Sequence, residues 1–390
     1  MLARDPSAID EPYLRRVCEE HWPESQTLEF KRAPPTVEDR GNQEFLKDVC
    51  ALANADGGDL VYGIEEETGR AAAIRAVDQP LDPLKRRLGQ ILEARVEPRL
   101  VGLIMTEVVV EGGHVLILRV PASFNGPHRY HHDNHSKFVA RSGTHTSELT
   151  YEQLRMAFDR TGTLGERARV FRQARLDMIA TGKTWRPLHP GPTCVVHLIP
   201  LSAMAGRQAI DIPALHNAYL PFMFDGWGGA TRDTNLDGLV VHPGGARDQG
   251  TLAYTQIFRT GAFEAMRHGG RLVDEERLIP AITVSSFIRD GLAKFLTACV
   301  QHDIGGPAIA GVGFLNVSGY QFAVDQRGFN WERATADRAN LVLPEQWIET
   351  VGVQPDVDTV ARPILDVLWQ CFGIERCNYY DADGRWHRRE

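Results

Sequence analysis

The sequence lacks most of the features that would assign a protein to a class on their own. It has only six cysteines among 390 residues, and no two of them form a CxxC pair, which argues against a zinc ribbon or a disulfide framework. No stretch approaches the roughly 18 uninterrupted apolar residues of a membrane span, and the first residues lack the apolar segment of a signal peptide. We therefore expect a cytoplasmic protein whose cysteines are buried as small hydrophobic side chains.

The chain also lacks an excess of positive charge and a phosphate loop. Its formal net charge is −8 at pH 7, which argues against a protein that coats a polyanion but does not exclude a local basic groove. The basic clusters Lys85–Arg87 and Arg167–Arg175 are predicted to be solvated helix faces, with nucleic-acid contact as the alternative. Because no GxxxxGK[ST] motif occurs, Gly57 and Gly58 are predicted to form a tight turn, and ATPase activity is not expected.

The pattern of apolar residues predicts an α+β fold. In one short segment Leu28 and Phe30 lie on one face of a strand and Glu29 and Lys31 on the other. Helical and strand patterns then follow in mixed order. The predicted helices are 11–22, 42–54, 82–94 and 150–160, and the predicted strands are 27–31, 59–65, 101–110, 114–120 and 137–141. This order favours a mixed sheet packed against helices.

Length and composition predict two domains. Glycines and polar residues at 161–165 predict a boundary, which gives domains 1–163 and 164–390. The second domain is also predicted to be α+β, and its role as a sensor, partner-binding or substrate-binding domain is left open. Its predicted strands are 194–199, 236–241, 252–258 and 312–324, and its predicted helix is 283–301.

Several acidic residues suggest a metal-dependent site. Glu24 and Glu29 are five residues apart, and Lys31 lies two residues after Glu29. The strand after Gly58 runs into Glu65 and Glu66. Carboxylates from two segments, with a cation beside them, are what a divalent-metal phosphodiester site needs. The alternative is an exposed Glu29–Lys31 pair of little energetic importance. Because side chains alternate along a strand, only one of Glu65 and Glu66 is expected to point at the other two acids.

Three motifs in order resemble the Schlafen AlbA_2 domain family. They are E-S-x-x-x-E-F-K at 24–31, A-x-A-N-x-x-G-G at 51–58 followed by an acidic strand end, and the R-S-G-T turn at 141–144 with the helix after it. The resemblance covers roughly residues 10–160. It implies catalytic carboxylates at Glu24, at Glu29 and at Glu65 or Glu66, where catalytic members of the family have aspartate. Glutamate can still bind a hard cation, although the metal position would shift.

Two further places are candidates for contact with nucleic acid. Arg129, Tyr130 and His132 lie in a basic segment with an aromatic residue, which suits phosphate contact and base stacking. Arg141 matches a family position near the end that faces nucleic acid. For this segment the alternatives are a solvated loop joining two strands and metal binding by the histidines of H-x-x-H-H at 128–132. For Arg141 the alternative is a turn-stabilising role.

The resemblance implies a metal-dependent endoribonuclease. Glu24, Glu29 and Glu65 or Glu66 would ligate Mg²⁺ or Mn²⁺, and Lys31 would assist at the phosphate. The expected substrate is structured RNA such as tRNA, in prokaryotic defence or a stress response, and a homodimer or the second domain would form the other wall of an RNA cleft. The alternatives are a non-catalytic regulator that binds DNA or RNA and a protein-interaction module.

Overall fold

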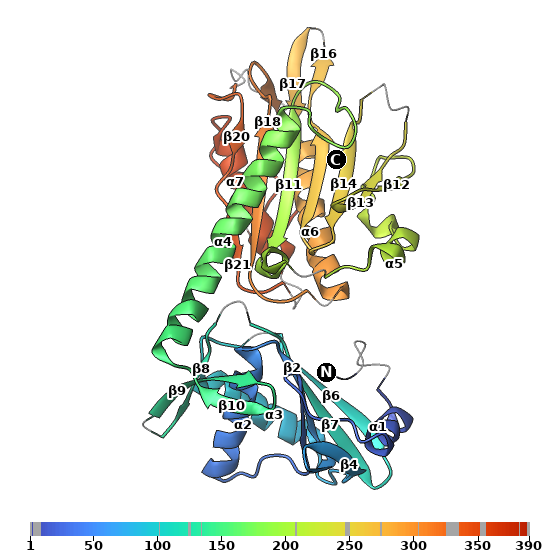
Figure 1. The fold of residues 1–390 in the computed structure, drawn as a ribbon. Coiled ribbons are helices and arrows are strands. Elements are labelled where there is room, and N and C mark those ends of the chain that lie inside the picture. The colour runs from blue at the N-terminus through green and yellow to red at the C-terminus, as the bar shows by residue number, and fades with distance from the viewer. Residues whose placement is uncertain are drawn as a thin grey trace. The chain divides into compact units, whose positions relative to one another are not determined.

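The chain folds into two compact units, Met1–Gly162 and Thr163–Glu390, in the computed structural model (Figure 1). The structure describes residues 2, 9–100, 102–123, 126–133, 135–206, 209–245, 250–273, 275–302, 304–324, 335–351, 356–381 and 383–387. Each unit combines helices with sheets, so the predicted α+β class is confirmed. None of the helices in these residues is long and apolar enough to cross a membrane.

The N-terminal unit alternates short strands and helices. Its helices are α1 (Glu11–Glu19), α2 (Asp39–Ala53), α3 (Leu81–Arg95) and the first part of α4 (Tyr151–Ala180). Its strands are β1 (Leu28–Lys31), β2 (Gly58–Tyr62), β3 (Ile64–Glu67), β4 (Arg70–Ile74), β5 (Val96–Glu97), β6 (Ile104–Val110), β7 (Gly113–Val120), β8 (Arg129–His132), β9 (His135–Ser142) and β10 (His145–Glu148).

One four-stranded sheet, in the order β1-β2-β7-β6, forms the centre of this unit. β1 and β2 run parallel, and α2 supplies the crossover that a parallel pair requires. Both faces of β2 are buried: Leu60 packs in the core with α2 and α3, and Val61 packs in the core with α1. The remaining strands form a sheet in the order β10-β9-β8-β5 and the β3–β4 hairpin.

The turn that joins α2 to β2 is structural, as predicted. Gly57 and Gly58 have φ angles of +72° and +148°, in the region that favours glycine. A Cβ on Gly58 would lie 2.5 Å from the carbonyl oxygen of Thr27, directly before β1. Asn54 Nδ2 donates hydrogen bonds to the carbonyl oxygens of His128 at 2.7 Å and Val139 at 2.8 Å. The turn therefore fixes β1, β8 and β9 against the end of α2.

The C-terminal unit is built on one large sheet. Its helices are the rest of α4, α5 (Ile212–Asn217), α6 (Ala281–Gln301), α7 (Val357–Gln370) and the 3₁₀ helices Leu201–Ala205 and Leu220–Phe222. Its strands are β11 (Thr193–Pro200), β12 (Thr231–Thr234), β13 (Gly238–His242), β14 (Ala253–Phe258), β15 (Phe263–His268), β16 (Arg271–Val273), β17 (Glu276–Pro280), β18 (Ala308–Leu315), β19 (Gln321–Ala323), β20 (Leu341–Val342) and β21 (Gln346–Ile348).

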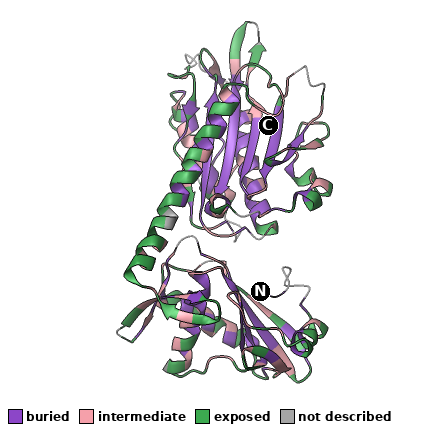
Figure 2. Cartoon of the chain, in the orientation of Figure 1, coloured by how far each residue is buried: buried purple, intermediate pink, exposed green. Residues whose placement is uncertain are grey.

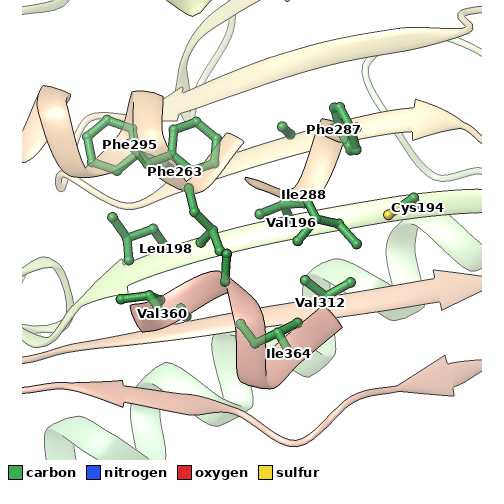
Figure 3. Packing of buried hydrophobic residues seen from close by; sticks show 14 of the residues in the cluster. Cys194, Val196, Leu198, Phe263, Phe287, Ile288, Phe295, Val312, Val360 and Ile364 are labelled. Carbon is green, nitrogen blue, oxygen red and sulfur yellow. The ribbon is translucent and has the colours of Figure 1, made fainter. Parts of the chain in front are cut away.

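In the described residues this sheet has eight strands, seven of them in the order β12-β13-β14-β15-β11-β18-β20, with β21 also paired to β18. Its strands are largely buried (Figure 2). On one face Val196 and Leu198 pack against Ile288 and Phe295 of α6 and Ile364 of α7 (Figure 3). The other face of the sheet packs against α4, where Leu176 and Ile179 form one hydrophobic cluster with Val195 of β11 and Met266 of β15.

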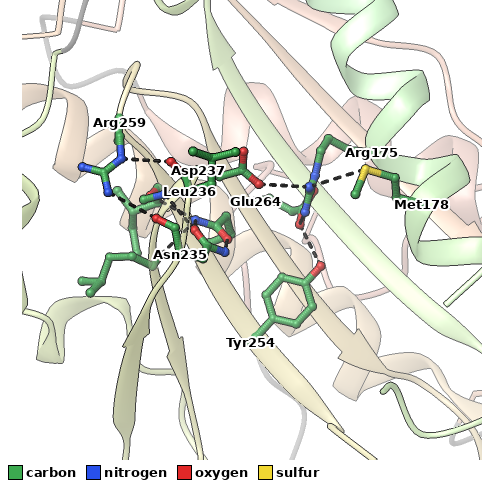
Figure 4. A network of polar contacts seen from close by, with 12 residues as sticks. Arg175, Met178, Asn235, Leu236, Asp237, Tyr254, Arg259 and Glu264 are labelled. Carbon is green, nitrogen blue, oxygen red and sulfur yellow. Dashed lines mark hydrogen bonds and ion pairs between the residues drawn. The ribbon is translucent and has the colours of Figure 1, made fainter. Parts of the chain in front are cut away.

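A buried polar network also joins α4 to the sheet (Figure 4). Glu264 accepts hydrogen bonds from Arg175 at 2.8 and 2.9 Å and from the Tyr254 hydroxyl at 2.7 Å, and it lies 2.9 Å from Nε2 of His197. Burial opposes ionisation of Glu264, but the hydrogen bonds from Arg175 and His197 outweigh it and hold its pKa well below the usual range. The prediction of a solvated face is therefore wrong for Arg175 and for Arg172, which is also buried.

Three local predictions differ from the structure. Residues 161–165 do not interrupt α4, which runs through them for 30 residues, because a helix tolerates isolated glycines at a modest cost. The predicted strand 59–65 is two strands, separated at Gly63 with φ +102°. The predicted strand 312–324 is β18 followed by β19. Of the six cysteines, all are free and five are buried, while Cys371 is only half-buried.

Candidate active site

A hollow of about 280 Å³ on the N-terminal unit collects all of the residues predicted to be catalytic. It is lined by Glu24, Glu29, Phe30, Lys31, Arg32, Glu65 and Glu66. The first five belong to β1 and its flanks, and the last two belong to β3. Two segments separated by more than 30 residues therefore meet at one place, as the motif order predicts.

Glu24 is held at the rim of the hollow by backbone contacts. Its amide donates to the carbonyl of Gly69 at 2.9 Å, and its Oε1 accepts from the amide of Phe30 at 2.9 Å. Burial raises the pKa of the Glu24 carboxyl, although the Phe30 hydrogen bond opposes the change, and the negative charges of Glu29 and Glu66 raise the pKa further. Glu24 therefore holds a proton more readily than an exposed glutamate does.

Glu29 lies between two cations. Its Oε1 accepts from Lys31 Nζ at 2.5 Å, and its Oε2 lies 2.5 Å from Nη1 of Arg141. The Glu29–Lys31 contact agrees with their predicted position on one face of β1. Glu29 is 8% exposed, so this pair differs from the exposed, weak pair that is the alternative.

Arg141 is buried beneath the hollow. Its side chain is 2% exposed, and its guanidinium also donates to the carbonyl oxygens of Ser25 at 3.0 Å and Gly143 at 3.1 Å. These contacts join β9 to the turn before β1. The geometry matches the turn-stabilising alternative and makes Arg141 a residue that positions Glu29, rather than one that faces a nucleic acid.

Asp48 of α2 is part of this cluster, although the sequence motifs do not point to it. Its Oδ2 lies 3.6 Å from Lys31 Nζ. Burial raises the pKa of Asp48 to about 6, against an opposing effect of Lys31. Burial alone would lower the pKa of Lys31, but Asp48, Glu29 and Glu24 raise it above its usual value. The available signal was an aspartate on the inward side of α2, three residues after Phe45 and four before Leu52.

Glu65 and Glu66 both line the hollow, and the expectation that only one of them points at Glu24 and Glu29 stays a prediction. The pairing of β3 with β4 shifts register opposite these two residues, with Ala72 as the extra residue of β4, and such a bulge increases the local twist of the hairpin. Glu65 forms ion pairs with Arg32 at 3.1 Å and Arg75 at 2.7 Å. Glu66 Oε2 accepts from the amide of Gly69 at 2.6 Å.

The other predicted nucleic-acid contacts lie on β8, away from the residues of the hollow. Tyr130 and His132 are 3% and 8% exposed, and Tyr130 belongs to the core beside α2. Their side chains are therefore not available for stacking or phosphate contact. Arg129 and His131 point to the accessible face, since strand residues alternate, but both contact Glu97, at 2.6 and 3.3 Å. Of Arg129, Tyr130 and His132, only Arg129 has an accessible charged group.

The carboxylates of the hollow are engaged in ion pairs and hydrogen bonds in this arrangement. Carboxylate oxygens are suitable ligands for Mg²⁺ or Mn²⁺. However, the described residues contain no group of three or more acidic, histidine or cysteine side chains placed to hold an ion. Glu29 and Glu65 are already paired with cations through both oxygens. Metal binding would require these ion pairs to open.

Comparison with known families agrees with the geometry of the N-terminal unit. Residues 24–150 match the family described as Schlafen, AlbA_2. These residues form a Schlafen AlbA_2 domain. The match begins at Glu24 and includes every residue that lines the hollow. The Schlafen AlbA_2 domain indicates a nucleic-acid-related function for the chain.

Two solved structures are similar to part of the chain. The DIP2311 protein from Corynebacterium diphtheriae is 23% identical over 32% of this chain and 22% of its own, with a TM-score of 0.24. The N-terminal domain of a putative ATP-dependent DNA helicase RecG-related protein from Nitrosomonas europaea is 18% identical over 30% of this chain and 74% of its own, also with a TM-score of 0.24. The alignment thus spans about a fifth of the Corynebacterium protein. No curated protein matches the sequence.

Proposed function

We propose that the hollow is a phosphodiester site and that the chain is an endoribonuclease acting on structured RNA such as tRNA. The observation that supports this most is the meeting of Glu24, Glu29, Lys31, Glu65 and Glu66 in one hollow of the Schlafen AlbA_2 domain. These residues come from two separate segments of the chain. Their convergence in one hollow therefore supports a shared functional role.

The side chains of the hollow supply two kinds of group that cleavage needs. Lys31 is 37% exposed at its side chain and Arg32 is 70% exposed, so both can reach a phosphate oxygen. Glu24 has a raised pKa and one oxygen fixed by the amide of Phe30. Its other oxygen can carry a proton toward the leaving oxygen, which is the role of a general acid.

The dependence on Mg²⁺ or Mn²⁺ stays a prediction from the family resemblance. Four carboxylates line the hollow, and they are the donors that these cations prefer. A cation would have to compete with Lys31, Arg141, Arg32 and Arg75 for them. A homodimer that closes the RNA cleft and a role in prokaryotic defence also stay predictions from the resemblance.

A non-catalytic protein that binds DNA or RNA is the second candidate. The ion pairs that occupy Glu29 and Glu65 favour it, because carboxylates used in this way stabilise the fold. In that case nucleic acid would bind without being cut. Binding would survive a chelator and would weaken steeply with added salt.

Incubation of the full chain with total tRNA separates the two candidates. We expect fragments in Mg²⁺ or Mn²⁺ and none in EDTA, with cleavage lost in Glu24→Gln. Glutamine keeps an oxygen that can accept from the amide of Phe30, so this variant should fold. If fragments also form in EDTA, the proposal of an endoribonuclease stands, but the proposed requirement for a metal ion is wrong. Intact tRNA in every condition, together with salt-sensitive binding, would contradict cleavage and favour the second candidate.

A further inference from the structure

A second and larger cleft adjoins the hollow. It has a volume of about 560 Å³ and is bordered by residues 32–37 after β1, residues 76–80 before α3, and the first turns of α3. Arg32 lines both this cleft and the hollow. A chain whose phosphate occupied the hollow would therefore place its neighbouring nucleotide at the cleft.

The walls of the cleft are stiff before any ligand binds. Pro34, Pro35, Pro80 and Pro83 line it, and the proline ring fixes φ at each position. Arg87 connects α3 to the opposite wall, because its Nη2 donates to the carbonyl of Pro35 at 2.5 Å and its Nη1 to Thr36 O at 3.2 Å. A cleft held in this way loses little conformational entropy when a ligand enters.

The lining suits a flat, mostly apolar group with polar edges. Proline rings and the side chain of Val37, which is 81% exposed, offer apolar surface, and Gln79 and Asp78 are also exposed. A nucleobase has these properties: its faces pack against apolar surfaces or an arginine plane, and its edges accept and donate hydrogen bonds. The volume lies within the range of about 300–1,000 Å³ that is usual for small-ligand sites.

We propose that this cleft binds an unpaired nucleotide of an RNA chain, next to the phosphate held in the hollow. The proposal rests on the proposed function of the hollow. Arg32 contacts the nucleotide where the two sites meet, and the proline walls take its base. A base inside a duplex is stacked and cannot enter, so the RNA must be single-stranded beside the bound phosphate.

The test compares two RNA hairpins of equal length and charge with the same terminal loop, one with an unpaired segment of three nucleotides beside the stem and one whose stem is paired to its end. Dissociation constants are measured by fluorescence anisotropy for the full chain at one salt concentration. The wild type should bind the hairpin with the unpaired segment about tenfold more tightly, which corresponds to about 1.4 kcal/mol.

Two variants locate this preference. Ala33→Trp places an indole in the cleft, and we expect it to remove the tenfold difference while leaving the affinity for the paired hairpin unchanged. The matched control is Val109→Trp, at a valine of β6 that is 69% exposed and lines neither cleft nor hollow. It should keep the difference. Gln79→Ala gives a second, milder variant in case the tryptophan disturbs folding, and it should reduce the difference.

The outcomes separate the cleft from the hollow. Equal affinity of the wild type for both hairpins, or a preference that survives both Ala33→Trp and Gln79→Ala, would overturn the proposal for the cleft and leave the hollow untouched. Failure of the wild type to bind either hairpin would overturn the proposed function, and the cleft proposal would fall with it.

Discussion

Asp48 shares Lys31 with Glu29, and this arrangement couples the charge of the hollow to the buried side of α2. Lys31 Nζ lies 2.5 Å from Glu29 and 3.6 Å from Asp48. The ammonium is thus held by two carboxylates, and Arg141 holds Glu29 from the other side. A phosphate that reaches Lys31 enters a network of compensating charges, which limits the cost of burying any one of them.

Replacement of Asp48 by asparagine should change stability in a pH-dependent way. Burial raises the pKa of Asp48 from 3.8 to about 6. The folded state therefore binds the proton more tightly than the unfolded state. This stabilising contribution is complete below about pH 4 and is lost as pH rises through about 6. Asparagine resembles the protonated form, so Asp48→Asn should nearly match the wild type near pH 4 and exceed it at pH 7.5, by about 3 kcal/mol.

Urea unfolding of the wild type and of Asp48→Asn at both pH values checks this expectation. Asp48→Glu serves as a control that keeps the charge. If Asp48→Asn were less stable than the wild type at pH 7.5, the ion pair with Lys31 would outweigh the cost of burying the carboxylate, and the account of Asp48 would be wrong.

Residue spacing identified part of this site. Glu24, Glu29 and Lys31 are recognisable because they lie within one motif, and the acids of β3 follow a clear turn and strand. Asp48 was not predicted because the apolar residues around it indicate the buried face of a helix. Its partner Lys31 lies in β1, so no local motif connects the two residues. Tyr130 and His132 were misassigned because a loop was expected where the chain forms β8, which buries every second residue.

At the scale of elements, local signals predicted regular helices and strands better than their ends. The bulge in β4 depends on its pairing with β3 and has no sequence pattern that would show it. The continuity of α4 depends on the packing of Leu176 and Ile179 against the large sheet, whereas its glycines, taken alone, indicate a break. Long-range contacts decided both features, and these cannot be deduced from a window of neighbouring residues.

Two glycine substitutions should have opposite effects. Gly162 lies inside α4 with open space where a Cβ would be, so Gly162→Ala should stabilise the protein by about 0.5–1 kcal/mol. Gly58 has φ +148°, and a Cβ there would lie 2.5 Å from Thr27 O, so Gly58→Ala should destabilise it by more than that amount. Denaturant unfolding measures both. A loss of stability in Gly162→Ala would contradict a continuous α4.

At the scale of the whole molecule, both units have an α+β fold, but only the N-terminal unit matches a known family. The Schlafen AlbA_2 match ends at residue 150, so the C-terminal unit is known here only through its fold. Composition and periodicity predicted its α+β class and its central strands. They did not predict α7 or the polar network around Glu264, because buried charges in a sheet read as surface positions in the sequence.

The network should be essential to the C-terminal unit. Glu264 is fully buried, and its carboxylate is the common partner of Arg175, Tyr254 and His197. Glu264→Gln leaves buried Arg175 with only its longer contact to Asp237, at 3.6 Å, so we expect a loss of about 3–5 kcal/mol. Urea unfolding should detect it, with Glu375→Gln, at an exposed residue of the same unit, as control. Equal stability of the two variants would show that the network contributes little.

The measurement that tests the central claim most directly is the single-turnover rate of tRNA cleavage by the wild type, Glu24→Gln and Glu44→Gln. Glu24 lines the hollow, whereas Glu44 is an exposed glutamate of α2 that does not. If the hollow cuts RNA, Glu24→Gln should be slower by at least about 100-fold, and Glu44→Gln should match the wild type. Equal rates for all three proteins, each shown to be folded, would contradict a phosphodiester site in this hollow.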